Sequence, residues 1–319
     1  HRLADTMTTH ALPVLAAVLL SVLAGCATTT PYEHPQPPLA GKYDMEGLVV
    51  APNTPSATRL GWREYFGDPY LLALLAQSLE NNRDLRAAMA RVTEARALYG
   101  IQRADQLPGI SAGAGASRAR VSADLSVIGS VFTSSQYQAT LNLSAWELDF
   151  WGRVRELKEA ALESYLASDA ARRSVRISLV AQTANLYLLE RELDERLATA
   201  RQALSTREEA ARILRRRYEV GAASKLDATQ SEVLLNQARS ELTLLERQRE
   251  QAHNALVLLV GIPLSSEARA LSAVEAGFAR DIAPGLPSDL LLDRPDVLAA
   301  EHGLKAAHAN VAAARAAFF

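Results

Sequence analysis

The feature that most limits how this chain can fold is a long stretch without helix-breaking residues. From Arg153 to about Arg217, about 65 residues pass without a proline or a glycine. At about 1.5 Å per residue this predicts a single helix of roughly 100 Å, whereas helices of globular proteins usually run about 8–20 residues. Leucine and alanine recur along it at coiled-coil spacing, at Leu186, Leu193, Leu197, Ala200 and Leu204.

A second long helix is predicted directly after the first. Gly221 interrupts the helical pattern, which resumes from about Leu226 to Val260 and stops at the Gly-Ile-Pro of residues 261–263. Two apolar stripes of this kind predict a pair of packed helices, a helical hairpin over residues 149–262. The stripe of the second helix, with Arg249 as a polar interruption, consists of Leu235, Ala238, Leu242, Leu245, Ala252, Leu256 and Leu259.

Before these helices the spacing of apolar residues changes from 3.6 to 2. Ile110–Ser122 and Tyr137–Ala145 both alternate, so residues 109–148 are predicted to form a β-hairpin. Each strand is close to the length of about 9–11 residues that crosses a bilayer at a tilt. The side chains expected to face lipid are Tyr137, Leu141 and Leu143, and those expected to line a water-filled lumen are Gln138, Thr140, Asn142 and Ser144.

The N-terminus has the pattern of a lipoprotein export signal. Ala11–Ala24 is nearly all apolar, but it is shorter than the roughly 20 residues that span a bilayer and fits the apolar part of a signal peptide over residues 1–25. The ending Leu-Ala-Gly-Cys resembles the lipobox of bacterial lipoproteins, which implies lipidation of Cys26, the only cysteine. Residues 26–61, rich in Pro and Thr, are then an extended, lipid-anchored tether.

Shorter helices precede and follow these elements. Asp68-Pro69 begins a helical pattern, and a further helix is expected from about Asp84 to Gln106. At an offset of 212 residues, Arg294-Pro295-Asp296 opens a similar alanine-rich helix, with proline suited to its first turn. The predicted order is therefore first-repeat helices at 62–108, a linker or equatorial segment at 263–293, and the truncated start of a second repeat at 294–319.

Charge and motifs argue against nucleic-acid binding and catalysis. The formal net charge is −2, so no basic field points to nucleic acid. The sequence has no His-Glu-x-x-His zinc motif, no phosphate-binding glycine-rich loop and no Gly-x-Ser-x-Gly. His302 and His308 lie six residues apart, off one helix face, and Gly113 and Gly115 fit a crowded strand. We expect no catalytic residue, no cofactor and no metal site.

The turn between the two long helices, residues 215–227, is the best candidate for a binding surface, and we call it the helix tip. Its arginines lie at a helix C-terminus, where cations suit the helix dipole. They are either solvated end charges or part of a contact with another protein. Ser224-x-x-Asp227 matches a capping box. The candidate contact residues are Arg217, Tyr218, Gly221 and Ser224.

Five segments resemble the outer-membrane efflux factor family, in the lipoprotein branch that serves resistance-nodulation-division pumps. They are Trp62–Pro69, Asn81–Arg86, Glu147–Arg153, Arg217–Gly221 and Arg294–Asp296. The resemblance implies a mainly α fold with a transmembrane β-hairpin: a long coiled-coil helical tunnel subunit that contributes strands to a shared trimeric outer-membrane β-barrel. A complete subunit would give two hairpins, so the chain resembles a C-terminally truncated member.

The same resemblance implies a channel subunit of a tripartite efflux system, a passive exit duct for small molecules across periplasm and outer membrane. The homotrimer would be lipid-anchored in the bacterial cell outer membrane, touch its lipid and extend into the periplasm. The implied partners are a periplasmic adaptor (membrane fusion) protein and an inner-membrane resistance-nodulation-division pump. Asp227 falls where the family places an acidic residue near the periplasmic gate; helix capping alone is the other interpretation. Drugs, dyes and metal ions all remain open as substrates.

Two other classes of function compete with a duct. A structural or adhesive coiled-coil lipoprotein without channel activity would share the export signal and the long helices, but it would not need amphipathic strands between helices. An enzyme would need clustered histidine, cysteine or acidic groups, which the sequence lacks. The alternating hairpin therefore favours a channel.

Overall fold

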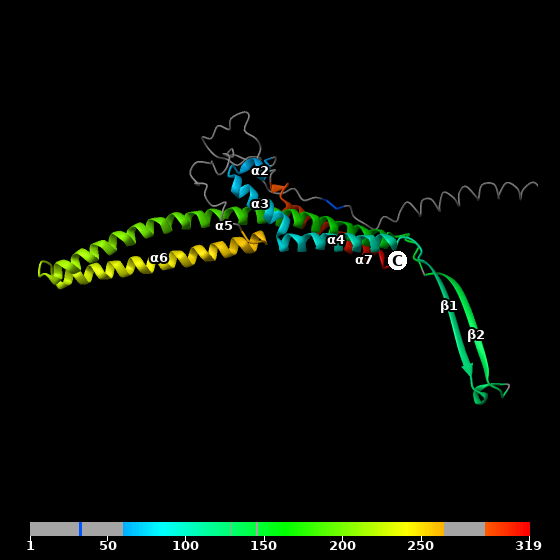
Figure 1. Ribbon diagram of the computed structural model, residues 1–319. Coiled ribbons are helices and arrows are strands. Elements are labelled where there is room, and N and C mark those ends of the chain that lie inside the picture. The colour runs from blue at the N-terminus through cyan, green and yellow to red at the C-terminus, as the bar shows by residue number, and fades with distance from the viewer. Residues whose placement is uncertain (1–31, 34–59, 128, 145, 265–290) are drawn as a thin grey trace, which may run out of the picture. The chain divides into compact units, whose positions relative to one another are not determined.

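The computed structural model describes residues 32–33, 60–127, 129–144, 146–264 and 291–319. The predictions for the signal peptide, for Cys26, for most of the tether and for most of the linker lie outside these residues. The chain divides into two compact units, one made of residues 1–36, 92–168 and 299–319 and the other of residues 37–91 and 169–298. The elements are α2 (Trp62–Tyr65), α3 (Pro69–Asn81), α4 (Arg83–Ala104), β1 (Ile110–Val121), a short 3-10 turn (Ala123–Leu125), β2 (Phe132–Leu143), α5 (Arg153–Glu219), α6 (Lys225–Val260) and α7 (Pro295–Ala316) (Figure 1).

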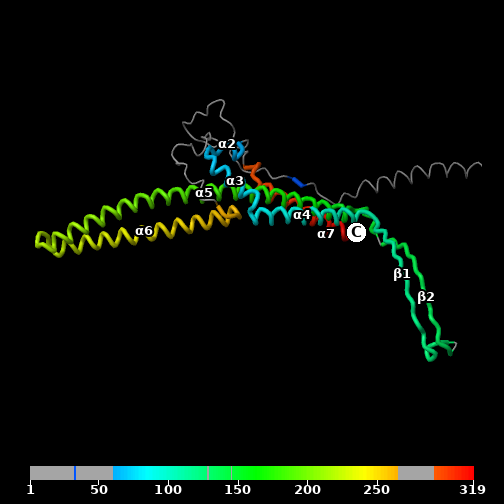
Figure 2. The backbone as a smooth tube through the Cα atoms, in the orientation of Figure 1, coloured from blue at the N-terminus to red at the C-terminus, as the bar shows by residue number. Residues whose placement is uncertain are grey.

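The two predicted long helices are confirmed. α5 is continuous over 67 residues and α6 over 36, and the two run side by side up to the turn that joins them (Figure 2). Leu193 and Leu197 of α5 pack against Leu245 and Ala252 of α6 in a buried cluster. The predicted stripe is wrong at its end: Leu259 is only half-buried, because Val260 takes the fully buried position that packs into the core around α3.

The main core of the second unit lies where α3 packs against α5 and α6. Asp68 begins α3 by accepting hydrogen bonds from the backbone N–H groups of Tyr70 and Leu71, as expected for an N-cap. The same buried carboxylate accepts a hydrogen bond of 2.5 Å from the Tyr187 hydroxyl on α5. The buried core residues are Leu71, Leu74, Leu75, Ala184, Tyr187, Leu256 and Val260.

The start of α4 is attached to the end of α6 by one buried asparagine. The Asn82 side-chain oxygen accepts from the Leu85 N–H at 2.9 Å, and its amide donates to the Leu259 carbonyl at 2.9 Å. Gly261 ends α6 with a φ of 84°, and a Cβ there would lie 2.8 Å from the Asn81 carbonyl oxygen. Only glycine fits this position, because a left-handed conformation and a close backbone approach coincide.

The predicted β-hairpin is confirmed in the first unit, with a different second strand. β1 and β2 pair antiparallel over 12 residues each, from Ile110 opposite Leu143 to Val121 opposite Phe132. β2 therefore starts five residues before the predicted Tyr137, because Thr133–Gln136 continue the backbone pairing without apolar alternation. Ser144 lies just past the strand, where its N–H donates to the Gly109 carbonyl at 2.8 Å.

The junction between β2 and α5 explains part of the Glu147–Arg153 motif. Glu147 and Arg153 form an ion pair, and the Asp149 carboxylate accepts from the Arg155 N–H at 2.8 Å, near the start of α5. Gly152 has a φ of 81°, a conformation that other residues rarely adopt. Among the described residues, none of the helices combines the length and apolar character needed to cross a membrane.

Candidate functional site

The helix tip is closed by two complementary caps. At the end of α5, the Ala222 N–H donates to the Arg217 carbonyl at 2.7 Å and the Gly221 N–H to the Tyr218 carbonyl at 2.9 Å, with Gly221 at a φ of 75°. This is the hydrogen-bond pattern of a glycine-terminated helix. The predicted capping box is also present: the Ser224 hydroxyl accepts from the Asp227 N–H, and the Asp227 carboxylate accepts from the Ser224 N–H.

All four predicted contact residues of the helix tip are exposed. Arg217, Tyr218, Gly221 and Ser224 are accessible to a partner. The hydrogen bonds from Ser224 hold the pKa of Asp227 below its usual range, with a smaller contribution from the positive charge of Arg217. Asp227 therefore carries a negative charge at neutral pH on an exposed turn beside arginines.

Above the tip, ion pairs between α5 and α6 recur every seven residues. Arg215 pairs with Glu232 at 2.5 Å, Glu208 with Arg239 at 3.3 Å, and Arg201 with Glu246 at 3.7 Å. We call these three the heptad ion pairs. The sign of the charge alternates along each helix, which favours the observed register of the two helices, although each exposed pair contributes only about 0–1 kcal/mol.

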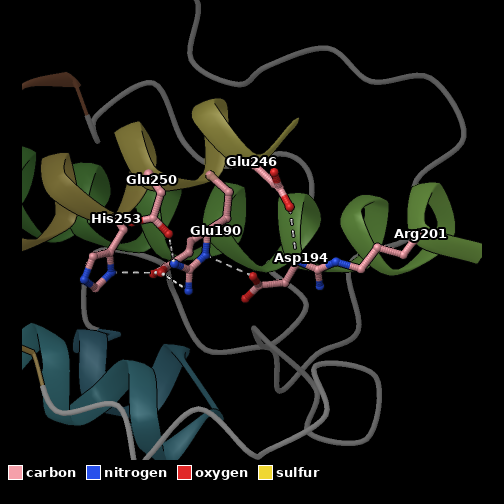
Figure 3. Close-up of polar contacts among 7 residues, drawn as sticks. Glu190, Asp194, Arg201, Glu246, Glu250 and His253 are labelled. Atoms are coloured by element: carbon pink, nitrogen blue, oxygen red, sulfur yellow. Dashed lines mark hydrogen bonds and ion pairs between the residues drawn. The ribbon is translucent and has the colours of Figure 1, made fainter. Parts of the chain in front are cut away.

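A cluster of charges around Arg249 follows the heptad ion pairs along the seam, and within it Glu190 is buried and Arg249 is half-buried (Figure 3). The Arg249 guanidinium approaches Glu190 at 3.5 Å, donates to Asp194 at 3.2 Å and pairs with Glu250 at 2.5 Å. His253 Nδ1 lies 3.0 Å from the Glu190 carboxylate. Burial alone would lower the pKa of Arg249, but the hydrogen bonds with Glu250 and Asp194 raise it, so the side chain stays charged inside the seam.

The sequence pattern identified Arg249 as a polar interruption of the apolar stripe of α6, but it did not predict the acidic residues with which Arg249 forms ion pairs. Glu190 is only 6% exposed, and a buried carboxylate needs a partner. The available signal was a pair of acidic residues, Glu190 and Asp194, spaced four apart beside the leucine stripe of α5. Their alignment with Arg249 depends on the pairing register of two helices, which the sequence pattern does not fix.

The hairpin register assigns the predicted lumen-facing residues to one side of the sheet. Cross-strand neighbours lie on the same face, and Asn142, Thr140 and Gln138 are opposite Ser111, Gly113 and Gly115. Polar side chains on β2 thus face small residues on β1. A Cβ added at Gly113 would lie 3.0 Å from the Thr140 hydroxyl, which is consistent with the small residue there.

The two histidines of α7 have structural partners within the first unit. His302 Nδ1 lies 2.5 Å from the Glu163 carboxylate of α5. His308 makes an edge contact with the Tyr32 ring at 5.7 Å between centroids. Within the described residues, no group of three or more His, Cys, Asp or Glu side chains is placed to hold a metal ion.

Comparison with known proteins assigns the family. The family model described as outer membrane efflux protein matches residues 74–262, which run from α3 through the hairpin to the end of α6. The chain belongs to the outer membrane efflux protein family. The match covers the three elements from which a duct was inferred: the β-hairpin, α5 and α6.

Relatives of the efflux protein are similar along nearly the whole chain. The toluene efflux pump outer membrane protein TtgC of Pseudomonas putida is 42% identical over 306 residues, which are 95% of this chain and 63% of that protein. The outer membrane protein OprJ of Pseudomonas aeruginosa is 41% identical over 307 residues, 96% of this chain and 64% of that protein. The chain thus spans slightly less than two thirds of the length of these relatives.

A solved structure shares the fold. The outer membrane channel MtrE of Neisseria gonorrhoeae, in its open state, is 37% identical with a TM-score of 0.74, over 92% of this chain and 64% of that one. The expected fold class is therefore confirmed: a mainly α subunit of the outer-membrane efflux channel type, with a β-hairpin between its helices.

Proposed function

We propose that the complete protein is an outer-membrane channel subunit, a passive exit duct through which a pump expels small molecules. The observation that carries the proposal is the combination, within one family match, of a hairpin with 12-residue strands and a pair of antiparallel helices. Strands of that length suffice to cross a bilayer at a tilt, and the 36 residues of α6 extend about 54 Å. The chain supplies structure and carries out no chemistry.

The proposed assembly is a homotrimer with two further partners. The exposed tip residues Arg217, Tyr218, Gly221 and Ser224 present a positive charge, an aromatic ring and two small residues, which suit a contact with a periplasmic adaptor protein. An inner-membrane resistance-nodulation-division pump supplies the energy. Asp227 near the axis of the trimer helps to hold the periplasmic end closed by pairing with an arginine.

The proposed substrate class is based on the names of two related proteins. Proteins 42% identical to this chain are described as components of a toluene efflux pump and of an antibiotic efflux pump. We infer small organic molecules of mixed polarity as cargo. A structural coiled-coil lipoprotein without a channel is the less favoured function, because it gives no reason for the paired amphipathic strands.

The test is complementation of a strain whose own outer-membrane duct has been deleted. The complete protein, expressed with an adaptor and a pump of a related efflux system, is expected to lower accumulation of a fluorescent dye and to restore tolerance of toluene and of antibiotics. Tolerance that stays at the level of the deletion strain, with the protein present in the outer membrane, would contradict the proposal. Expression without the pump serves as the control, because a passive duct exports nothing alone.

Lipid attachment is part of the proposal. Cys26→Ser is expected to abolish incorporation of a radiolabelled lipid precursor, because only the thiol at this position can take the thioether-linked lipid. Comparable labelling of Cys26→Ser and the native protein would refute the lipid attachment but would not affect the proposal that the protein is a duct.

A further inference from the structure

The β-hairpin carries two arginines on the face that the proposed function turns toward lipid. In the observed register, Ala112 lies opposite Leu141 and Ala116 opposite Tyr137, so these apolar residues share one face. We call it the apolar strand face. Because side chains alternate along a strand, Arg118 and Arg120 continue the same face beyond Ala116.

The position of these arginines along the strand coincides with the expected edge of the hydrocarbon layer. Arg120 lies ten residues beyond Ile110 on β1. At about 3.4 Å per residue and a strand tilt of about 40°, this is a height of about 26 Å, and the apolar band of such proteins is about 25 Å tall. Tyr137 lies opposite Ala116, six residues beyond Ile110, so on the same scale it lies at a height of about 16 Å, inside the apolar band.

Both guanidinium groups are available for an external anion. Arg118 and Arg120 are exposed, and their cross-strand neighbours Ser135 and Thr133 are uncharged. Within the described part of the chain no carboxylate, including that of Asp124 in the connecting turn, forms an ion pair with either arginine. Two cations without a carboxylate partner at the edge of an apolar surface attract the anionic groups of a membrane surface.

We propose that Arg118 and Arg120 bind the phosphate groups of the outer-leaflet lipid, the phosphorylated glycolipid lipopolysaccharide. The proposal rests on the proposed function, which places the helices in the periplasm and hence the connecting turn of the hairpin on the outer side. Residues two apart on one strand face are about 7 Å apart, and arginine forms bidentate hydrogen bonds with phosphate. The pair therefore fits one phosphate between the two side chains, or two neighbouring phosphates.

The experiment uses the complete protein, purified in detergent, stripped of lipid and titrated with lipopolysaccharide while binding is followed by native mass spectrometry. The R118Q/R120Q variant is expected to bind about 25-fold more weakly, because each cation at a membrane surface contributes a factor of about five. R118K/R120K keeps the charges but cannot form the bidentate hydrogen bonds, so its affinity should lie between those of the native protein and R118Q/R120Q. R207Q is the matched control, since Arg207 is an exposed arginine on α5 and its loss should change nothing.

Two ligand controls separate the lipid from other sources of phosphate. Dephosphorylated lipopolysaccharide should bind the native protein and R118Q/R120Q equally weakly, and inorganic phosphate at the same concentration should not compete. Competition by inorganic phosphate would overturn the lipid assignment in favour of a free anion. Equal affinity of the native protein and R118Q/R120Q for the phosphorylated lipid would overturn the site itself.

Failure of this inference can be distinguished from failure of the proposed function. The Tyr137→Cys variant reports whether the apolar strand face lies in the membrane. A water-soluble thiol reagent labels this cysteine only if the apolar strand face is outside the membrane. If position 137 is protected but R118Q/R120Q binds lipopolysaccharide normally, the arginine site is wrong and the duct stands. If position 137 is freely labelled, the hairpin is not inserted, and both proposals fall together.

Discussion

At the scale of single residues, Asp227 has a role that the structure divides into two separable parts. Its backbone N–H and carboxylate complete a capping box with Ser224, while the charge of the carboxylate is the part that a gate would use. Removal of Ser224 breaks the cap and leaves the carboxylate at position 227. Ser224→Ala is therefore a matched control for Asp227→Ala.

We predict that Asp227→Ala raises the resting conductance of the complete channel in planar bilayers several-fold, whereas Ser224→Ala leaves it unchanged. Both variants lose the cap, so both should lower thermal stability to a similar small extent, and only the first removes a charge that can hold the trimer closed. If the two variants and the native channel have equal resting conductance, Asp227 only caps α6 and does not hold the channel closed.

Tyr187 provides a prediction for alkaline pH. Burial raises the pKa of Tyr187, and its hydrogen bond to Asp68 adds to the effect. Since the unfolded pKa is about 10, the folded state retains this proton at a pH where the unfolded chain loses it. The stabilisation is therefore complete below about pH 10 and is lost as the pH rises toward the folded pKa.

The matching experiment compares native protein with Tyr187→Phe by urea unfolding of the complete protein in detergent. At pH 7 the variant should be less stable by about 1–3 kcal/mol, because the Asp68 carboxylate loses a buried hydrogen bond. Between about pH 10 and pH 12 the difference should shrink. Tyr218→Phe is the control, since Tyr218 is exposed at the helix tip. A difference that stays constant with pH would show that the Tyr187 proton is not coupled to folding.

At the scale of helices and strands, the elements that could be predicted correctly are those in which apolar residues recur at a constant spacing over a long stretch. α5, α6 and most of the β-hairpin follow from the spacing of apolar residues over dozens of positions. The start of β2 at Phe132 could not be predicted from this spacing, because Thr133, Ser134 and Ser135 are all polar and show no alternation of apolar and polar residues. Contacts between distant residues were also missed: Tyr187 and Asp68 are 119 residues apart in the chain and Arg249 and Asp194 are 55 apart.

For the hairpin we predict labelling with a period of two. Single cysteines from 137 to 143, introduced into the complete protein with Cys26 replaced by serine, should react with a water-soluble reagent at positions 138, 140 and 142. Positions 137, 141 and 143 should stay protected in membranes and become reactive in urea. A period near 3.6, or uniform reactivity, would refute the assignment of the two faces.

At the scale of the whole molecule, the described residues contain one β-hairpin, and the chain covers 64% of MtrE. We predict that residues 1–319 alone do not conduct. Three copies would bring six strands together, and even eight strands leave an interior filled by side chains. Single-channel recordings from this fragment and from the complete protein provide the comparison. Fragment currents of similar size to those of the complete protein would show that one hairpin per subunit is enough.

The heptad ion pairs have a mechanical consequence for any opening motion. If α6 slid by one heptad along α5, Arg215 would face Arg239 and Glu208 would face Glu246; a slide in the other direction would set Arg215 against Lys225 and Glu208 against Glu232. Each shift replaces attraction by repulsion, so both neighbouring heptad registers are less favourable than the observed one. α5 and α6 should therefore move as one rigid body. A displacement at the helix tip is then transmitted along about 54 Å of paired helix rather than absorbed as shear between its two halves.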